Sequence, residues 1–329
     1  MVNLLKTPGR WFGTLLAAGF LMAAQSYAAP ERIARPGTIN YVEGQVTVNG
    51  QSVTSQQLGS LEVAPGEVLE TGNNAKAEML LTPGTFLRLG DNSAVRMVSP
   101  SLTDTQVELV KGRAMVEADL VEKENRLDIV DNGVNTVLEK KGIYEFNANQ
   151  PLVAVYDGKA QVRVDDHTVD VGKGKELQLA QTTGKLKPQK FDRNDTDNLY
   201  AWSKLRSEYT AQANASSAQM IVAANPYWWY GTGWYWNPYF DSWAFVPGAG
   251  FLYSPFGFGF YSPLYYSSFV PYYPGFYRGG VINRGVVTHR GFGAPALRTS
   301  PGPSFRGFSG GARGFAGGGG AHIGGIGRR

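Results

Sequence analysis

The side chains of this sequence that are best suited to binding are aromatic, and they gather in one stretch of the chain. Residues 225–277 contain 24 of the 41 Phe, Trp and Tyr residues and no lysine. Aromatic rings bring large contact areas to binding surfaces and have faces on which sugars can stack. Five tryptophans of this stretch are therefore the candidate partner-binding residues: Trp228, Trp229, Trp234, Trp236 and Trp243.

The aromatic stretch allows three interpretations. Pro and Gly interrupt it every few residues, so we expect no long helix there. So many exposed rings would form a larger apolar patch than monomeric proteins usually show, and something must cover them. In the first interpretation the rings pack on themselves and over the rest of the protein. In the second they form a platform for a partner or a glycan. In the third they lie at a membrane surface, where Trp and Tyr are favoured.

Positive charge follows the aromatic stretch. After Ser242 the chain has eight arginines and no Asp, Glu or Lys; the net charge of the whole chain is +4, so residues 1–241 sum to −4. Residues 278–329 are rich in Gly, which is typical of a disordered tail. An anionic envelope polymer or an anionic lipid surface would suit such a tail, and a tail without a ligand is the alternative. The candidate contacts are Arg278, Arg290, Arg306 and Arg313.

The residues that most enzymes and metal sites need are missing or scattered. The chain has no cysteine, and its three histidines are far apart. No phosphate-binding loop, zinc-protease motif or nucleophile elbow is present. We expect neither an enzyme nor a protein with a metal or cofactor.

The N-terminus indicates export. Lys6 and Arg10 precede an apolar run from Trp11 to Ala24, and small residues follow at a cleavage site after Ala28. Residues 1–28 therefore have the pattern of a secretory signal peptide, since the apolar run is short of the ~20 residues of a spanning helix. We expect a mature chain in the periplasm, at the cell surface or outside the cell, without a transmembrane helix. Nucleic acid is not expected as a ligand there.

Residues 38–182 carry strand patterns. Apolar and polar residues alternate, and Asn49-Gly50 is a strong hairpin signal. A second turn is expected at residues 165–168. A short motif with a central glycine recurs around Gly44, Gly112 and Gly158. We interpret it as one bend used at several corners of a single all-β body of short antiparallel strands, a sandwich or roll.

The same region resembles the FecR domain of periplasmic proteins. The matching segments are residues 81–93, 107–116 and 153–162, with a closing strand at Val171-Gly172 and a lead-in at 66–78. The resemblance covers about 140 residues and implies the FecR fold. FecR-type transducers also have a cytoplasmic segment that handles a sigma factor and then a membrane helix. This chain has the export signal instead, so the regulatory mechanism does not carry over.

One helix is expected at residues 191–215, after the β domain. Asp192, Asp195 and Asp197 favour a helix N-terminus. Leu199, Trp202, Leu205 and Tyr209 then fall at helical spacing on one face. Residues 211–224 have the composition of a linker or a fraying helix end.

Together these features predict an exported, non-enzymatic binding or scaffolding protein of the bacterial cell envelope. Its partner would be an envelope protein or polysaccharide. The alternatives are a periplasmic component of FecR-type signal transduction and a glycan-binding protein. A chain without residues 225–329 is expected to stay folded and soluble and to lose its envelope association.

Overall fold

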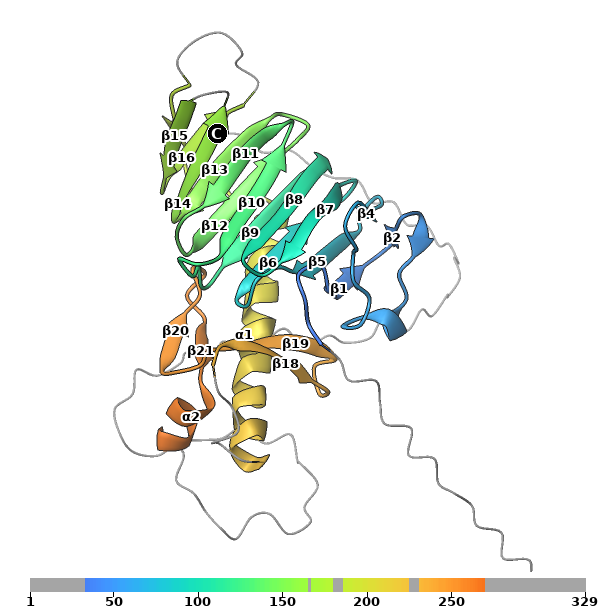
Figure 1. Ribbon diagram of the computed structural model, residues 1–329, viewed down its shortest axis with the longest axis vertical. Coiled ribbons are helices and arrows are strands. Elements are labelled where there is room, and N and C mark those ends of the chain that lie inside the picture. The colour runs from blue at the N-terminus through green and yellow to red at the C-terminus, as the bar shows by residue number, and fades with distance from the viewer. Residues whose placement is uncertain (1–32, 165–166, 180–185, 225–230, 270–329) are drawn as a thin grey trace, which may run out of the picture. The chain divides into compact units, whose positions relative to one another are not determined.

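The computed structural model describes residues 33–164, 167–179, 186–224 and 231–269 (Figure 1). They all belong to one unit of the chain, Met1–Tyr273, whereas a second unit, Pro274–Arg329, lies outside the described residues. The expected signal peptide and the Gly/Arg-rich tail also lie outside them.

Alternating apolar residues build two β-sheets that share one core. Sheet 1 has eight strands in the order β1-β5-β6-β9-β12-β13-β16-β17. Its strands are β1 (Ile39–Glu43), β5 (Lys76–Leu80), β6 (Thr85–Leu89), β9 (Arg113–Ala118), β12 (Gly142–Asn147), β13 (Leu152–Asp157), β16 (Lys175–Gln178) and β17 (Gln189–Lys190).

Sheet 2 has nine strands in the order β15-β14-β11-β10-β8-β7-β4-β2-β3. Its strands are β2 (Val46–Val48), β3 (Gln51–Ser52), β4 (Val68–Thr71), β7 (Ala94–Ser101), β8 (Asp104–Lys111), β10 (Arg126–Asp131), β11 (Val134–Leu138), β14 (Lys159–Val164) and β15 (His167–Gly172). A 3-10 turn, η1 (Ser55–Gln57), follows β3. The described strands pair antiparallel except for β8 and β10, which are parallel. The predicted all-β fold is confirmed.

The recurring glycine motif marks corners where the chain passes from one sheet to the other. Gly44 lies between β1 and β2, Gly112 between β8 and β9, and Gly158 between β13 and β14. Their φ angles are 71°, 77° and 98°, a region that residues with a Cβ avoid. At Gly112 a Cβ would also stand 2.6 Å from the Cα of Ser93. The interpretation of the motif as a repeated bend is confirmed.

The predicted Asn-Gly hairpin is present between β2 and β3. Asn49 and Gly50 have φ angles of 48° and 76°, as a tight turn between twisted strands requires. The expected second hairpin joins β14 to β15, and residues 165–166 of its turn lie outside the described residues.

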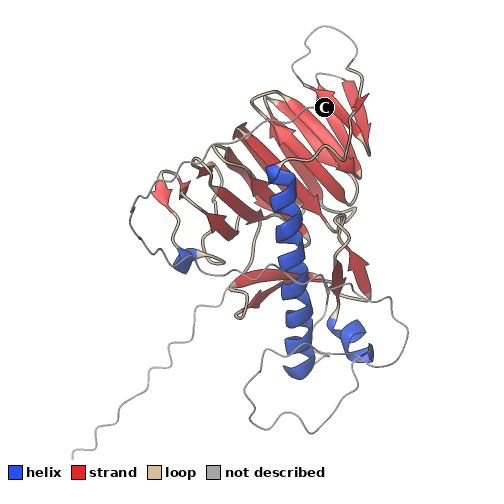
Figure 2. Cartoon of the chain, turned by 180° about the vertical axis from the view of Figure 1, so that it is seen from behind, coloured by secondary structure: helices blue, strands red, loops and turns tan. Residues whose placement is uncertain are grey.

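Sheet 1 is covered on both faces. One face packs against sheet 2 around a core that includes Met79, Leu87, Val116 and Phe146. The other face, called the outer face here, is covered by the helix α1 (Asn198–Ala224) and by part of the aromatic stretch (Figure 2). Side chains on both faces of sheet 1 are therefore buried. Strands such as β6 and β9 are in consequence buried along almost their whole length.

Helix α1 starts later and ends later than predicted. Asp192 and Asp195 precede it in a turn, and the Asp197 carboxylate accepts a hydrogen bond from the Tyr200 amide at 2.9 Å, which caps the helix. Residues 211–224, expected as a linker or a fraying helix end, are part of the helix, where Ala211, Asn214, Ser217 and Ile221 are buried.

Part of the aromatic stretch forms regular elements. Two hairpins and a short helix follow α1: β18 (Gly233–Asn237) with β19 (Ser242–Val246), β20 (Phe251–Tyr253) with β21 (Gly259–Tyr261), and α2 (Pro263–Phe269). Phe245 and Phe260 are fully buried with Leu80 and Phe86 of sheet 1. For residues 231–269, the interpretation as packing over the β domain agrees with the structure.

Candidate functional site

A chain of buried charges crosses the outer face of sheet 1. Glu78 of β5, Arg88 of β6 and Glu117 of β9 occupy neighbouring positions on adjacent strands. The Arg88 Nε atom lies 2.8 Å from Glu78 Oε2, and Arg88 Nη1 lies 2.6 Å from Glu117 Oε2. All three side chains are fully buried. Such a group is stable only when its charges are paired and hydrogen-bonded.

Helix α1 supplies further partners of this network. Arg206 Nη2 lies 2.8 Å from Glu78 Oε1, and the Ser207 hydroxyl donates to Glu117 Oε1 at 2.5 Å. Near the start of the helix, the Trp202 indole donates to the Glu43 carboxylate at 2.8 Å. The buried face of α1 is consequently polar, and it fits the sheet by hydrogen bonds and charge as well as by packing.

The pairing is reflected in the acidity of Glu78. Burial by itself raises the pKa of this carboxyl, but the guanidinium groups of Arg206 and Arg88 outweigh burial and lower the pKa to about 2. For Arg88, burial lowers the pKa, and the charges of Glu117 and Glu78 overcome this effect and raise it. The network is therefore charged at neutral pH and serves to hold α1 on the sheet.

Asp119 stands beside the network, next to Glu117, and forms no ion pair within the described residues. It is 2% exposed, and neither carboxylate oxygen has a hydrogen-bond partner among the described residues. Burial, followed by the charge of Glu117, raises the pKa of Asp119 well above its usual range. The carboxyl is thus pushed toward its neutral form.

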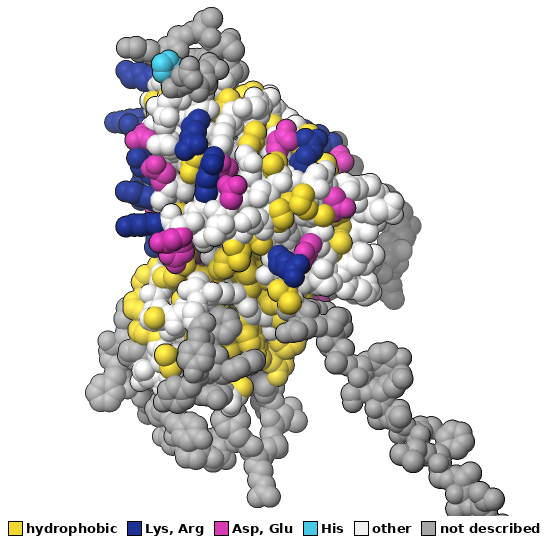
Figure 3. All heavy atoms as spheres, viewed as in Figure 1, with side chains coloured by type: hydrophobic (Ala, Val, Ile, Leu, Met, Phe, Trp, Pro, Cys, Tyr) yellow, Lys and Arg dark blue, Asp and Glu magenta, His cyan; other side chains and the backbone are white. Residues whose placement is uncertain are grey.

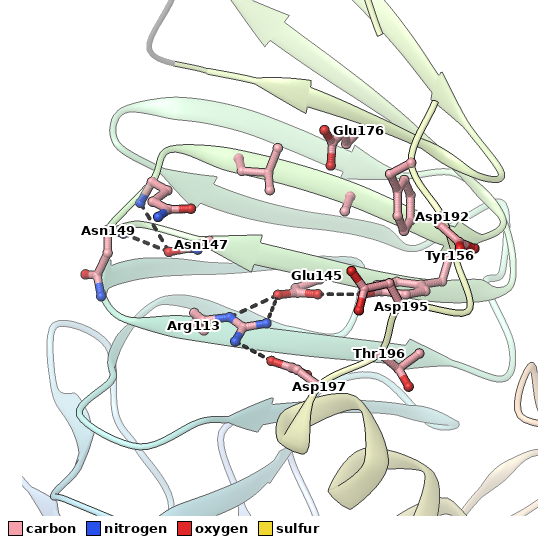
Figure 4. A pocket seen from close by; sticks show the side chains of 14 residues that line it. Arg113, Glu145, Asn147, Asn149, Tyr156, Glu176, Asp192, Asp195, Thr196 and Asp197 are labelled. Carbon is pink, nitrogen blue, oxygen red and sulfur yellow. Dashed lines mark hydrogen bonds and ion pairs between the residues drawn. The ribbon is translucent and has the colours of Figure 1, made fainter. Parts of the chain in front are cut away.

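A cavity of about 610 Å³ lies on the outer face of sheet 1, next to the N-terminus of α1 (Figure 4). Its lining side chains come from β9, β12, β13 and β16 and from the segment that leads into the helix. The side chains that the argument uses are Arg113, Glu145, Tyr156, Glu176, Asp192 and Asp195.

Arg113 organises one side of the cavity. Its guanidinium forms ion pairs with Glu145 of β12 and with Asp197 at the helix N-terminus. Burial lowers the pKa of Arg113, and Glu145 and then Asp197 more than compensate and raise it. The Tyr156 hydroxyl donates to Glu145 Oε2 at 3.1 Å, and burial followed by the Glu145 charge raises the pKa of this phenol. Arg113 and Tyr156 are held in fixed positions by these contacts.

Aromatic rings form a second side of the cavity. The Tyr156 ring lies 4.9 Å from the Phe191 ring and 4.8 Å from the Tyr200 ring, measured between centroids. Tyr200 in turn contacts Phe256 at 5.3 Å, edge to face. Such ring pairs hold the aromatic side chains in place. A ligand that contacts them therefore does not have to pay for ordering them.

The free charge in the cavity is negative. Glu176, Asp192 and Asp195 make no ion pair within the part of the chain that the structure describes. Arg113 is already paired with Glu145 and Asp197. The arrangement can accept hydrogen bonds from a cationic group, and Tyr156 and Phe191 offer ring surface beside it.

The tryptophans predicted to contact a partner are placed differently. Trp243 is only 4% exposed, and its indole donates to the Gly59 carbonyl at 2.8 Å, so the structure does not offer this ring to a partner. Trp234 and Trp236 are half-buried and pack with Phe86 and Trp243. These three rings close the cover over sheet 1 because they lie against its buried apolar residues. Trp228 and Trp229 lie outside the described residues, as do Arg278, Arg290, Arg306 and Arg313.

The sequence alone did not indicate the cavity. In the sequence, Asp192 and Asp195 indicate only a helix start, and Arg113 is simply the residue after Gly112. Glu145, Tyr156 and Glu176 are single residues in alternating strands and stand out only when the sheet brings them together. The signal that could have found them was the polar outward position repeated on β9 and β12.

Comparisons with known proteins find a family match and similar solved structures. Residues 67–164 match the family model described as FecR protein, so the chain contains a FecR domain. Two crystal structures of a candidate anti-sigma factor from Parabacteroides distasonis ATCC 8503, at 1.65 and 2.50 Å resolution, are similar at 15% identity with a TM-score of 0.35. The similarity covers 42% of this chain and 64% of that protein. No curated protein matches the sequence.

No helix among the described residues has both the length and the apolar character needed to cross a lipid bilayer. Helix α1 has 27 residues, but its buried face carries Arg206, Ser207 and Asn214.

Proposed function

We propose that this chain is an exported, non-enzymatic binding protein of the bacterial cell envelope, whose FecR domain recognises an envelope protein through the cavity beside α1. Export is supported by the pattern of residues 1–28. Polysaccharide and lipid remain further classes of envelope partner.

One observation carries the recognition part of the proposal. The outer face of sheet 1 is covered by α1 and the aromatic hairpins over β5 and β6, whereas side chains of β9, β12, β13 and β16 line the cavity. Glu176, Asp192 and Asp195 line it, and none of them forms an ion pair with another described residue. These carboxylates lie next to a rigid aromatic wall. Such a site suits a basic side chain of a partner protein.

The proposal is tested with a double variant, Glu176→Gln with Asp195→Asn. Glu122→Gln with Glu124→Gln is the matched control, because it removes the same charge from exposed positions between β9 and β10. Immobilised wild-type chain and both variants are incubated with a bacterial envelope extract, and bound proteins are quantified by mass spectrometry. We expect at least one protein to bind the wild type and the control and to bind the cavity variant about tenfold less.

Equal capture by all three chains would contradict recognition at the cavity. The same experiment reports on export when the N-terminus of the chain recovered from the envelope is sequenced. The expected N-terminus is Ala29, and an intact Met1 in a soluble cytosolic pool would contradict export.

A second candidate function is a periplasmic role in FecR-type signal transduction. The match of residues 67–164 to the FecR model favours it. The identity of the captured protein separates the two functions. An outer-membrane receptor or a membrane-bound regulator favours signalling, whereas a structural envelope protein favours scaffolding.

A further inference from the structure

A patch of aromatic rings is exposed on the second hairpin of the aromatic stretch and on α2. Phe251 is 45% exposed, Tyr253 52% and Leu264 44%. The Phe251 ring lies 5.5 Å from Tyr253, 6.4 Å from Tyr261 and 4.9 Å from Tyr265, so the rings form one continuous surface. We call these five residues the aromatic patch.

The aromatic patch differs from the buried side of the same stretch. Phe260 of β21 points into the interior, and Phe251 and Tyr253 of β20 lie on the surface. Figure 3 shows charged side chains over the two sheets, whereas the part of the molecule with β18–β21 and α2 shows hydrophobic and uncharged atoms. Exposed apolar surface without charge marks a contact site for something apolar or amphipathic.

The polar groups near the aromatic patch are not arranged for a sugar. Residues 242–269 contain no Asn, Gln, Asp, Glu, Lys, Arg or His. Ser254 and Ser262 are buried, and the Ser267 and Ser268 hydroxyls donate to the Leu264 carbonyl. A sugar placed on the rings would find few side chains to bond its hydroxyl groups, which a specific carbohydrate site needs.

A lipid interface needs no such groups. Tyrosine rings are favoured at the boundary between headgroups and acyl chains, because the ring is apolar and the hydroxyl stays in water. Lys141, which donates to the Tyr253 carbonyl at 3.0 Å, adds a cation at the edge of the patch. Eight arginines and no acidic residue follow in residues 278–329. Stable peripheral binding takes two signals, and ring insertion with basic charge is one such combination.

We infer that the aromatic patch of β20, β21 and α2 is a contact surface for the headgroup region of an anionic membrane. This inference deepens the proposed envelope role and rests on it, but it uses a surface separate from the cavity. The rings enter the interface, and Lys141 lies at headgroup level, where it attracts anionic lipid.

The test is flotation of the chain beginning at Ala29, which keeps every described residue and lacks the apolar run Trp11–Ala24. Vesicles of phosphatidylcholine alone are compared with vesicles that contain about 30% phosphatidylglycerol. We expect binding to the anionic vesicles and weaker binding to the neutral ones. The variant Phe251→Ser with Tyr253→Ser should lower the partition coefficient about tenfold or more, because it removes two exposed rings.

The matched control is Val98→Ser with Val110→Ser, which removes two side chains that are each 42% exposed on sheet 2. It should leave the partition within about twofold of wild type. Equal vesicle binding by the patch variant and the wild type would overturn the inference. So would patch-dependent binding to insoluble cell-wall glycan with no vesicle binding. We expect the variant Glu176→Gln with Asp195→Asn to bind vesicles like the wild type. Loss of vesicle binding in the patch variant alone would show that this surface acts independently of the cavity.

Discussion

Two acidic side chains on the same face of sheet 1 show how strongly local partners control a buried charge. Glu78 accepts hydrogen bonds from Arg88, Arg206 and Asn40 and is kept ionised. Asp119 directly follows β9, lies beside Glu117 and forms no ion pair in the described structure, and it is pushed toward its neutral form. The difference comes from pairing, since both residues are buried.

At the residue scale, Asp119 should make the protein less stable as the pH rises. Its pKa is raised in the folded chain, so the native state holds the proton more tightly than the unfolded chain. That stabilisation is complete below the unfolded pKa of about 4 and is lost as the pH rises toward the folded pKa. Asp119→Asn cannot ionise, so we expect the difference between its free energy of unfolding and that of the wild type to shift in favour of the variant as the pH rises above about 4.

Guanidinium unfolding at several pH values measures this difference. Glu124→Gln is the control, because it neutralises an exposed carboxylate close in the sequence. Its offset from wild type should stay within about 0.5 kcal/mol at every pH. A constant offset between Asp119→Asn and wild type across the whole range would show that Asp119 ionises in the folded protein as it does in the unfolded chain.

At the element scale, the parts of the fold that depend on local sequence were predictable. Asn49-Gly50 specifies a turn by its own backbone preferences, and Gly44, Gly112 and Gly158 do the same for the corners. Strand alternation then gave the all-β class. The parallel pairing of β8 with β10 is different, because β9 separates these two strands in the sequence and belongs to the other sheet. No local sequence pattern encodes such a pairing.

The buried face of α1 could not be predicted for a physical reason. Periodicity arguments assume that the buried stripe is apolar. Leu199 and Trp202 are indeed buried, but Leu205 and Tyr209 are exposed, and Arg206 and Thr210 take their place. The helix meets charged residues of sheet 1, so charge and hydrogen bonding select its face. The cavity escaped prediction similarly, because its lining side chains come from distant strands.

Arg206 should therefore be the residue of α1 on which its docking depends most. Arg206→Met keeps the volume but removes one cation from Glu78, and we expect the free energy of unfolding to fall by about 2–4 kcal/mol at pH 7. The pKa of Glu78 is lowered to about 2 in the folded chain. The contribution of the pair is present above pH 4.5 and is lost as the pH falls toward 2, so the cost of the substitution should shrink over that interval.

Lys204→Met is the matched control on the exposed side of the same helix. It should change stability by no more than about 0.5 kcal/mol. Denaturant unfolding of both variants at pH 7 and pH 3 gives the comparison. If Arg206→Met and Lys204→Met were equally mild at pH 7, the polar network would not be what holds α1 on the sheet.

At the scale of the whole molecule, the aromatic stretch is divided between structure and surface. Trp243, Phe245 and Phe260 are buried against Leu80 and Phe86 of sheet 1, and the Asn214 amide of α1 donates to the carbonyls of Phe245 and Tyr261. The FecR domain, α1 and residues 231–269 thus share one interior. This differs from the expectation that residues 225–329 can be removed without loss of the fold.

Two shortened chains test where the fold ends. A chain that stops at Ala224 loses the cover over Leu80 and Phe86, and we expect its free energy of unfolding to fall by at least about 4 kcal/mol, as when buried Phe and Trp rings are removed. A chain that stops at Phe269 keeps every described element and should unfold at the wild-type denaturant concentration. The measurement is guanidinium unfolding followed by far-ultraviolet circular dichroism, because the two chains keep different numbers of tryptophans. Equal stability of the Ala224 chain and the wild type would mean that the hairpins rest on the sheet without supporting it, whereas loss of stability in the Phe269 chain would extend the folded unit into residues 270–329.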